Sequence, residues 1–123
     1  MDVRISDAEL DVMEVLWAAG QPLTAAEVAD RIDADRGWTL ATVKTMLSRL
    51  AAKGALMHRE DGRRFLYSPA IKREAYVGNE SRRFVEKLFG GRISPLVARL
   101  AEEDGLDQED IAAIEALLKE LKS

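Results

Sequence analysis

The sequence predicts a mainly α-helical protein in which a winged helix-turn-helix precedes a C-terminal helical region. Three observations support this prediction. Apolar residues recur at helical spacing between capping signals up to Lys53, a short hairpin pattern follows, and helical periodicity then resumes to the end. Three helices followed by a hairpin are the element order of a winged helix. We expect a winged-helix domain over residues 1–70 and a helical dimerisation domain over residues 71–123.

The first predicted helix runs from about Asp7 to Ala19. Ser6 and Glu9 have capping-box spacing at its start, and Gly20 suits the left-handed residue after its end. Its inward residues are expected to be Leu10, Met13, Leu16 and Trp17.

A second, shorter helix is predicted after an extended segment. Thr24 and Glu27 repeat the capping-box spacing, and the apolar pattern continues to about Ile32. Residues 21–23 are expected to be extended, with a short strand as an option, and residues 33–37 to form a loop.

The third predicted helix, Thr39 to Lys53, carries the clearest functional signal. Thr39 is its expected N-cap, and Gly54 is expected just beyond its end. No carboxylate occurs from Arg36 to Arg59, whereas an ordinary solvated helix mixes both signs of charge. Its apolar stripe consists of Val43, Met46, Leu47 and Leu50.

The opposite face of this helix combines cations with small and hydroxyl side chains, which can approach a polyanion closely. We therefore predict a DNA recognition helix; the alternative is the solvated face of a core helix. For Lys53, an action on the helix dipole alone is an equal alternative. The predicted DNA-contacting residues are Thr39, Ala41, Thr42, Lys44, Thr45, Ser48, Arg49 and Lys53.

A hairpin is predicted next, with strands Leu56–Glu60 and Arg63–Ser68 around Asp61-Gly62, a dipeptide typical of type I′ turns. Its alternation predicts one apolar face. That face holds Leu56, Phe65 and Tyr67.

Three arginines, Arg59, Arg63 and Arg64, are expected near the hairpin tip. We predict that they contact phosphate or the minor groove, with Arg63 and Arg64 in the DNA-binding set. The alternative is that they keep an exposed edge strand soluble.

The formal net charge of −4 conceals an uneven distribution. Residues 1–35 hold 2 Lys/Arg against 9 Asp/Glu, residues 36–73 hold 9 against 2, and residues 74–123 hold 7 against 11. Because salt screens charges beyond about 10 Å, this local basic block matters more than the total.

No metal site, cofactor or enzymatic activity is expected. The chain has no cysteine and one histidine, His58, and it lacks a glycine-rich phosphate loop. His58 on the first wing strand leaves a phosphate contact open. Trp17 and Trp38 are predicted core residues, with stacking platforms as the alternative.

Three further helices are predicted beyond the hairpin. The first runs from about Ile71 to Phe89 and ends at Gly90-Gly91. The second is expected to begin at Ser94-Pro95, as N-cap and first helical residue, and to end at Gly105. Asp107 is the expected N-cap of the last.

The apolar stripes of these helices are expected to form a dimer core, because the segment is short for a self-sufficient one. An intrachain core is the alternative. A two-fold dimer also matches a palindromic DNA site. The predicted dimerisation residues are Phe84, Leu88, Phe89, Leu96, Leu100, Ile111, Ile114, Leu117, Leu118 and Leu121.

Segments along the whole chain carry a resemblance to one family. They are Ile5-Ser6-Asp7-Ala8-Glu9, Val12-Met13, Leu16-Trp17, Trp38-Thr39, Thr42-Val43-Lys44-Thr45, Leu47-Ser48-Arg49-Leu50, Lys53-Gly54, Phe84-Val85, Gly90-Gly91 and Leu106-Asp107-Gln108-Glu109-Asp110-Ile111. Together they resemble the penicillinase repressor family of bacterial transcription regulators, of the BlaI/MecI type.

The resemblance implies a homodimeric repressor that binds a palindromic operator of β-lactamase-type or related genes. It also implies relief by proteolysis in the C-terminal region, triggered by a membrane-bound sensor. Well-studied members of the family are cut at an Asn-Phe bond, which corresponds here to Arg99-Leu100 and makes this pair the candidate cleavage site. The apolar residue after the bond is kept, but Asn is replaced by Arg.

The N-terminal segment lacks a leader pattern, and no stretch is long enough to span a bilayer, so a cytoplasmic protein is expected. Two alternatives to a DNA-binding repressor stay open. One is a winged-helix module that binds protein, and the other is a regulator that responds to a small molecule.

Overall fold

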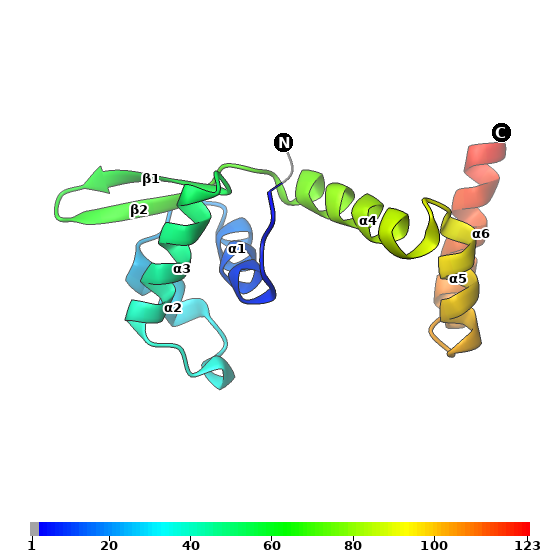
Figure 1. Cartoon of the computed structure of the whole chain (residues 1–123), viewed down its shortest axis with the longest axis horizontal. Helices are drawn as coiled ribbons and strands as arrows, with labels where there is room; N and C mark the ends of the chain where they lie inside the picture. Colours follow the sequence, from blue (N-terminus) through cyan, green and yellow to red (C-terminus); the bar gives the residue numbers. More distant parts are fainter. Residues whose placement is uncertain (1–2) are drawn as a thin grey trace. The chain divides into compact units, whose positions relative to one another are not determined.

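A computed structural model of the chain describes residues 3–123 and confirms a mainly helical winged-helix architecture (Figure 1). The chain divides into two compact units, with the boundary between Asn79 and Glu80, inside a helix. The elements are α1 (Asp7–Ala19), α2 (Ala25–Arg31), the 3-10 turn η1 (Ala34–Arg36), α3 (Leu40–Ala52), β1 (Leu56–Asp61), β2 (Arg64–Pro69), α4 (Arg73–Phe89), α5 (Ile93–Glu102) and α6 (Gln108–Lys122).

Capping boxes begin α1 and α2, as the sequence predicts. The Glu9 amide donates to Ser6 Oγ at 3.1 Å, and the Ser6 amide donates to Glu9 Oε1 at 2.9 Å. Thr24 and Glu27 repeat the arrangement at 3.2 and 2.9 Å. Each box satisfies two backbone donors that a helix start leaves unpaired.

The core of the first unit lies between α1, α2, α3 and the base of the hairpin. Leu23 joins the edge of β2 through a single bridge to Tyr67, with backbone hydrogen bonds of 3.0 and 2.8 Å. The expected third strand is therefore one bridge long. The largest fully buried side chains are Val12, Met13, Leu16, Leu23, Val28, Val43, Leu47 and Leu50.

The hairpin turn lies one residue later than predicted. Asp61 pairs with Arg64, so Gly62 and Arg63 are the central residues. Gly62 has a φ of +68° and Arg63 a negative φ, which are the signs of a type II′ turn rather than type I′. Relative to the prediction the strands slide by two residues, which leaves each side chain on its predicted face.

The start of α5 also differs from the prediction. The helix begins at Ile93 after an N-cap at Arg92, so Ser94 and Pro95 lie inside its first turn. Proline is tolerated there because the first amide groups of a helix have no intrahelical partner.

At the end of α5, Asp104 and not Gly105 takes the left-handed conformation, with a φ of +57°. The Gly105 amide instead donates to the Leu100 carbonyl oxygen at 2.7 Å. A Cβ on Gly105 would lie 2.9 Å from that oxygen, so this close approach requires glycine. The last helix, α6, has Asp107 as its N-cap, as predicted, with the Asp110 amide 2.8 Å from Asp107 Oδ1.

The second unit contrasts with the first in burial. None of the residues that the structure describes in α4, α5 and α6 is buried. Across residues 3–123, no helix is long and apolar enough to cross a membrane.

Candidate nucleic-acid interface

The two faces of α3 differ in burial as the sequence predicts. Val43, Leu47 and Leu50 are buried, whereas Lys44 and Arg49 are exposed. Within residues 3–123 neither Lys44 nor Arg49 has an ion-pair partner, so both cations are available to an external anion. The remaining exposed residues of this face are Ala41, Thr45, Ser48 and Ala52.

Several hydroxyl groups of α3 already make hydrogen bonds within the chain. The Thr39 Oγ1 accepts from the Thr42 amide at 3.2 Å and lies 3.1 Å from the Thr42 hydroxyl. The Thr45 hydroxyl donates to the Ala41 carbonyl at 3.0 Å. Thr39 therefore caps the helix, while the hydroxyl oxygens of Thr42 and Thr45 keep acceptor capacity toward a ligand.

The structure places Lys53 against α1. Its Nζ lies 2.5 Å from Glu9 Oε1, in a carboxylate that is 4% exposed. Burial alone would raise the pKa of Glu9. The hydrogen bonds from Lys53 and Ser6, together with the charge of Lys53, outweigh burial and lower that pKa. Lys53 is thus paired with a carboxylate of the same chain, a role that its position in the sequence did not indicate.

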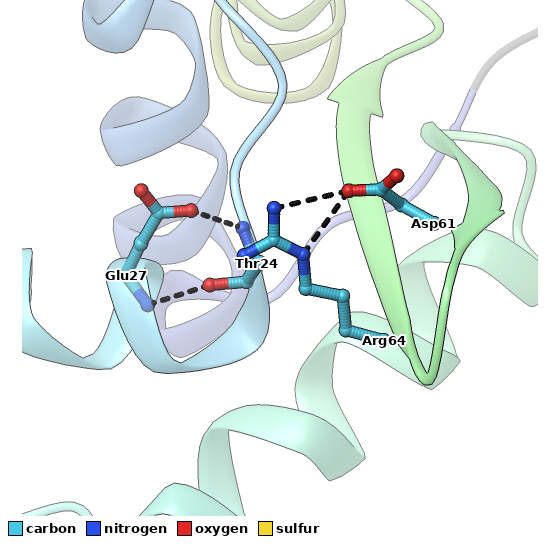
Figure 2. Close-up of polar contacts among 4 residues, drawn as sticks. All are labelled: Thr24, Glu27, Asp61 and Arg64. Atoms are coloured by element: carbon cyan, nitrogen blue, oxygen red, sulfur yellow. Dashed lines mark hydrogen bonds and ion pairs between the residues drawn. The ribbon is translucent and has the colours of Figure 1, made fainter.

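Of the three arginines predicted near the hairpin tip, Arg59 lies within β1 opposite Leu66, and Arg63 and Arg64 are held differently. Arg64 donates from Nε and Nη2 to Asp61 Oδ2, at 3.1 and 3.0 Å (Figure 2). Figure 2 also draws the capping box of Thr24 and Glu27, and Thr24 lines one hollow together with Arg64. Arg63 occupies the turn, is exposed, and has no ion-pair partner within the described residues.

The pKa of Glu27 is lowered mainly by its hydrogen bonds with Thr24, and the charges of Arg31 and Arg64 add to this effect. Arg64 therefore acts electrostatically on the start of α2 as well as on Asp61.

Two hollows separate α3 from the hairpin, and four of the ten predicted DNA-contacting residues line them: Lys44, Ser48, Arg63 and Arg64. The first, about 480 Å³, collects Lys44, Arg63 and Arg64 with the start of α2. The second, about 380 Å³, sets Ser48 and Ala52 against an aromatic wing face. That face consists of His58, Phe65 and Tyr67, with the His58 and Phe65 rings edge to face at 5.1 Å.

The sequence predicts Phe65 on an apolar face of the wing but does not indicate Phe65 or Leu40 as part of the candidate interface, although both line these hollows. The alternation that places Phe65 and Tyr67 on one face was the available signal. His58 belongs to the same cluster, and the described residues contain no group of metal-binding side chains.

Both tryptophans pack against the core, as predicted. Trp17 Nε1 donates to the Ile71 carbonyl at 2.9 Å, and its ring lies 5.9 Å from that of Tyr76. The Arg36 guanidinium lies over the Trp38 ring, with its Cζ 5.0 Å from the ring centroid.

Comparison with known proteins decides the family. Residues 5–120 match the penicillinase repressor family. This chain belongs to that family. The repressor is 36% identical over 120 residues to the penicillinase repressor of Bacillus licheniformis, covering 98% of this chain and 93% of the relative. It is 26% identical over 115 residues to the methicillin resistance regulatory protein MecI of Staphylococcus aureus strain N315, covering 94% and 93%.

Solved structures agree with this assignment. The solution structure of the DNA-binding domain of the repressor BlaI matches with a TM-score of 0.53 and 41% identity, covering 62% of this chain and 94% of that one. The Bacillus licheniformis BlaI monomer in complex with the blaP half-operator matches with a TM-score of 0.51 and 42% identity, covering 59% and 88%. The expectation of a DNA-binding transcriptional repressor is confirmed.

Proposed function

We propose that the exposed face of α3 and the tip of the hairpin form the DNA-contacting surface of this repressor, and that two copies bind a palindromic operator. The observation that carries the proposal is a set of exposed cations on elements that border common hollows: Lys44, Arg49 and Arg63, which have no ion-pair partner within residues 3–123. The half-operator complex of a relative supports the same use of the fold.

The side chains of α3 suit different parts of a duplex. Lys44 and Arg49 are long enough to contact phosphate or the acceptor edge of guanine. Thr42, Thr45 and Ser48 can contact base edges or thymine methyl groups, and Ala41 lets the backbone approach closely. Thr39, Lys53 and Arg64 make the intrachain contacts described above, so we assign them support of this surface.

A second copy of the chain is the proposed cover for the apolar residues of the second unit. Phe84, Leu88, Leu117 and Leu121 are each about half exposed or more in the single chain. Large apolar surfaces of this kind are typical of association sites. A two-fold dimer would present two copies of α3 to two half-sites.

For the regulated genes we propose the β-lactamase type or a related resistance function, in line with the names of the relatives. Relief by cleavage at Arg99-Leu100 is part of the same proposal, and both residues are exposed on α5. Mass spectrometry of chain recovered from cells exposed to a β-lactam would detect the two fragments; an intact chain under full derepression would contradict cleavage.

The DNA surface is tested by Lys44→Ala and Arg49→Ala. The probe is a duplex selected by the parent chain from a random pool, compared with a scrambled duplex by fluorescence anisotropy at several salt concentrations. Each substitution is expected to weaken binding to the selected duplex about tenfold. A lost phosphate contact would also reduce the slope of log K against log salt by about 0.9.

Because both side chains are exposed, the melting temperature is expected to stay unchanged. Lys87→Ala, which removes an exposed cation from α4, is the matched control and is expected to bind like the parent. Parental affinity in Lys44→Ala or Arg49→Ala would contradict the proposed surface.

A further inference from the structure

Three carboxylates of α1 form ion pairs with cations far along the chain. Glu9 pairs with Lys53, Asp11 with Arg36, and Glu14 with Arg73. The first two cations flank α3, since Arg36 ends the turn before it and Lys53 directly follows its last residue. The acidic helix therefore holds the recognition helix at both ends.

At the C-terminal end of α3, one carboxylate oxygen of α1 accepts two hydrogen bonds. Glu9 Oε1 accepts the Ser6 amide at 2.9 Å and the Lys53 Nζ at 2.5 Å, so the capping box of α1 fixes the carboxylate that holds α3. Lys53 is the C-cap of α3. The low pKa of Glu9 keeps this pair charged at neutral pH.

At the N-terminal end, two contacts hold the segment that leads into α3. The Arg36 guanidinium pairs with Asp11 and lies over the Trp38 ring, 5.0 Å from its centroid. Trp38 itself packs against the core. Arg36 thus ties the start of α3 both to α1 and to the hydrophobic core.

We infer that Glu9 and Asp11 are positioning residues for DNA binding, which hold α3 at its end and its start so that its exposed face keeps one orientation. The inference rests on the proposed DNA surface. Base contacts depend on side-chain placement more than phosphate contacts do. Loss of either anchor should therefore reduce discrimination between duplexes more than it reduces binding to DNA in general.

The loss of a negative charge and the loss of an anchor predict opposite changes in affinity for the selected duplex, so the two roles of these carboxylates can be separated by experiment. A carboxylate repels a polyanion, so its neutralisation alone would strengthen binding to any duplex. A positioning role predicts that Glu9→Gln and Asp11→Asn weaken binding to the selected duplex while binding to the scrambled duplex stays equal or becomes tighter. We expect the ratio of the two affinities to fall about threefold to tenfold.

The matched control is Glu14→Gln. It removes the same charge from the same helix, but its partner Arg73 lies at the start of α4 and not beside α3. The affinity ratio of Glu14→Gln is expected to equal that of the parent. Gln keeps the acceptor that Glu9 offers to Ser6, and Asp11 is about 40% exposed on its side chain, so Asp11→Asn tests the inference even where Glu9→Gln destabilises the fold.

Lys53→Met provides a second measurement, because it keeps the aliphatic stem and removes the charge. A positioning role predicts a lower affinity ratio with an unchanged salt slope, whereas a phosphate contact would reduce the slope by about 0.9. The effects of Lys53→Met and Glu9→Gln are also expected to be less than additive, since both break one pair.

The inference is overturned if Glu9→Gln and Asp11→Asn keep the parental ratio, if Glu14→Gln lowers it equally, or if Lys53→Met lowers the salt slope. Failure of the proposed surface is distinct, because Lys44→Ala would then bind like the parent. A weakened Lys44→Ala beside unaffected carboxylate variants refutes the positioning role alone.

Discussion

The two units of the repressor carry similar apolar stripes but differ in what covers them. In the first unit, the stripe of α3 meets α1 and α2, and Leu47 is fully buried. In the second unit, the stripe of α6 stays open, with Leu118 49% and Leu121 73% exposed. Periodicity therefore identifies a face that needs a partner, but it does not say whether that partner lies in the same chain.

The two units therefore gain their stability from different apolar contacts. Burial of apolar area contributes about 25 cal/mol per Å², and the first unit gains this within one chain. On our proposal, the second unit gains it from a second copy, so its stability depends on protein concentration.

The largest expected effect comes from truncating the closed core. Leu47→Ala is expected to lower the free energy of unfolding of the first unit by about 2–5 kcal/mol, through lost burial and a residual cavity. Leu118→Ala, the matched change in the open stripe, should leave that unit unaffected. Urea denaturation followed by tryptophan fluorescence separates the two, because both tryptophans lie in the first unit. Equal losses of unfolding free energy in the two variants would contradict the proposed difference between the units.

A somewhat smaller effect is expected from a charge in the open stripe. Leu117→Asp should split the dimer and weaken binding to the selected duplex about a hundredfold, because two half-sites are no longer engaged by one particle. Sedimentation velocity measures the association state, and Leu117→Met serves as the apolar control. A dimer that survives Leu117→Asp would place the interface elsewhere.

Acid should produce the smallest effect, and it acts on the first unit through Glu9. Because the folded pKa of this carboxyl is lowered, its contribution to stability is present above the ordinary glutamate pKa of about 4.3. The contribution is lost as pH falls through the folded pKa. Below about pH 4.3, the melting temperature of the parent should fall more steeply with decreasing pH than that of Glu9→Gln. Parallel profiles would show that Glu9 makes no ionic contribution.

Features encoded within one turn of a helix were predictable from the sequence. The capping boxes at Ser6 and Thr24 and the two-sided pattern of α3 depend on residues three or four positions apart. The turn at Gly62 was misplaced by one residue, because a slide of the strands by two residues keeps every side chain on its face and the alternation therefore does not distinguish the two registers.

Long-range partners had no local signal. Lys53 and Glu9 lie 44 positions apart, so the sequence suggested a phosphate contact or an action on the helix dipole for this lysine and gave no sign of its carboxylate partner. Arg63 and Arg64 are neighbours in sequence, yet only Arg64 is held by Asp61. Charge density predicted the region of the surface, but the roles of its individual cations depend on tertiary structure.

The hydrogen bond from Gly105 to the Leu100 carbonyl has a kinetic consequence. It closes the chain over the last turn of α5, on the very residue that follows the candidate scissile bond. On our proposal of cleavage at Arg99-Leu100, a protease that binds its substrate as an extended strand can act only after this turn and the last turn of α5 have unfolded locally. Access to the bond would then depend on local unfolding of this segment, which residue 105 helps to keep folded.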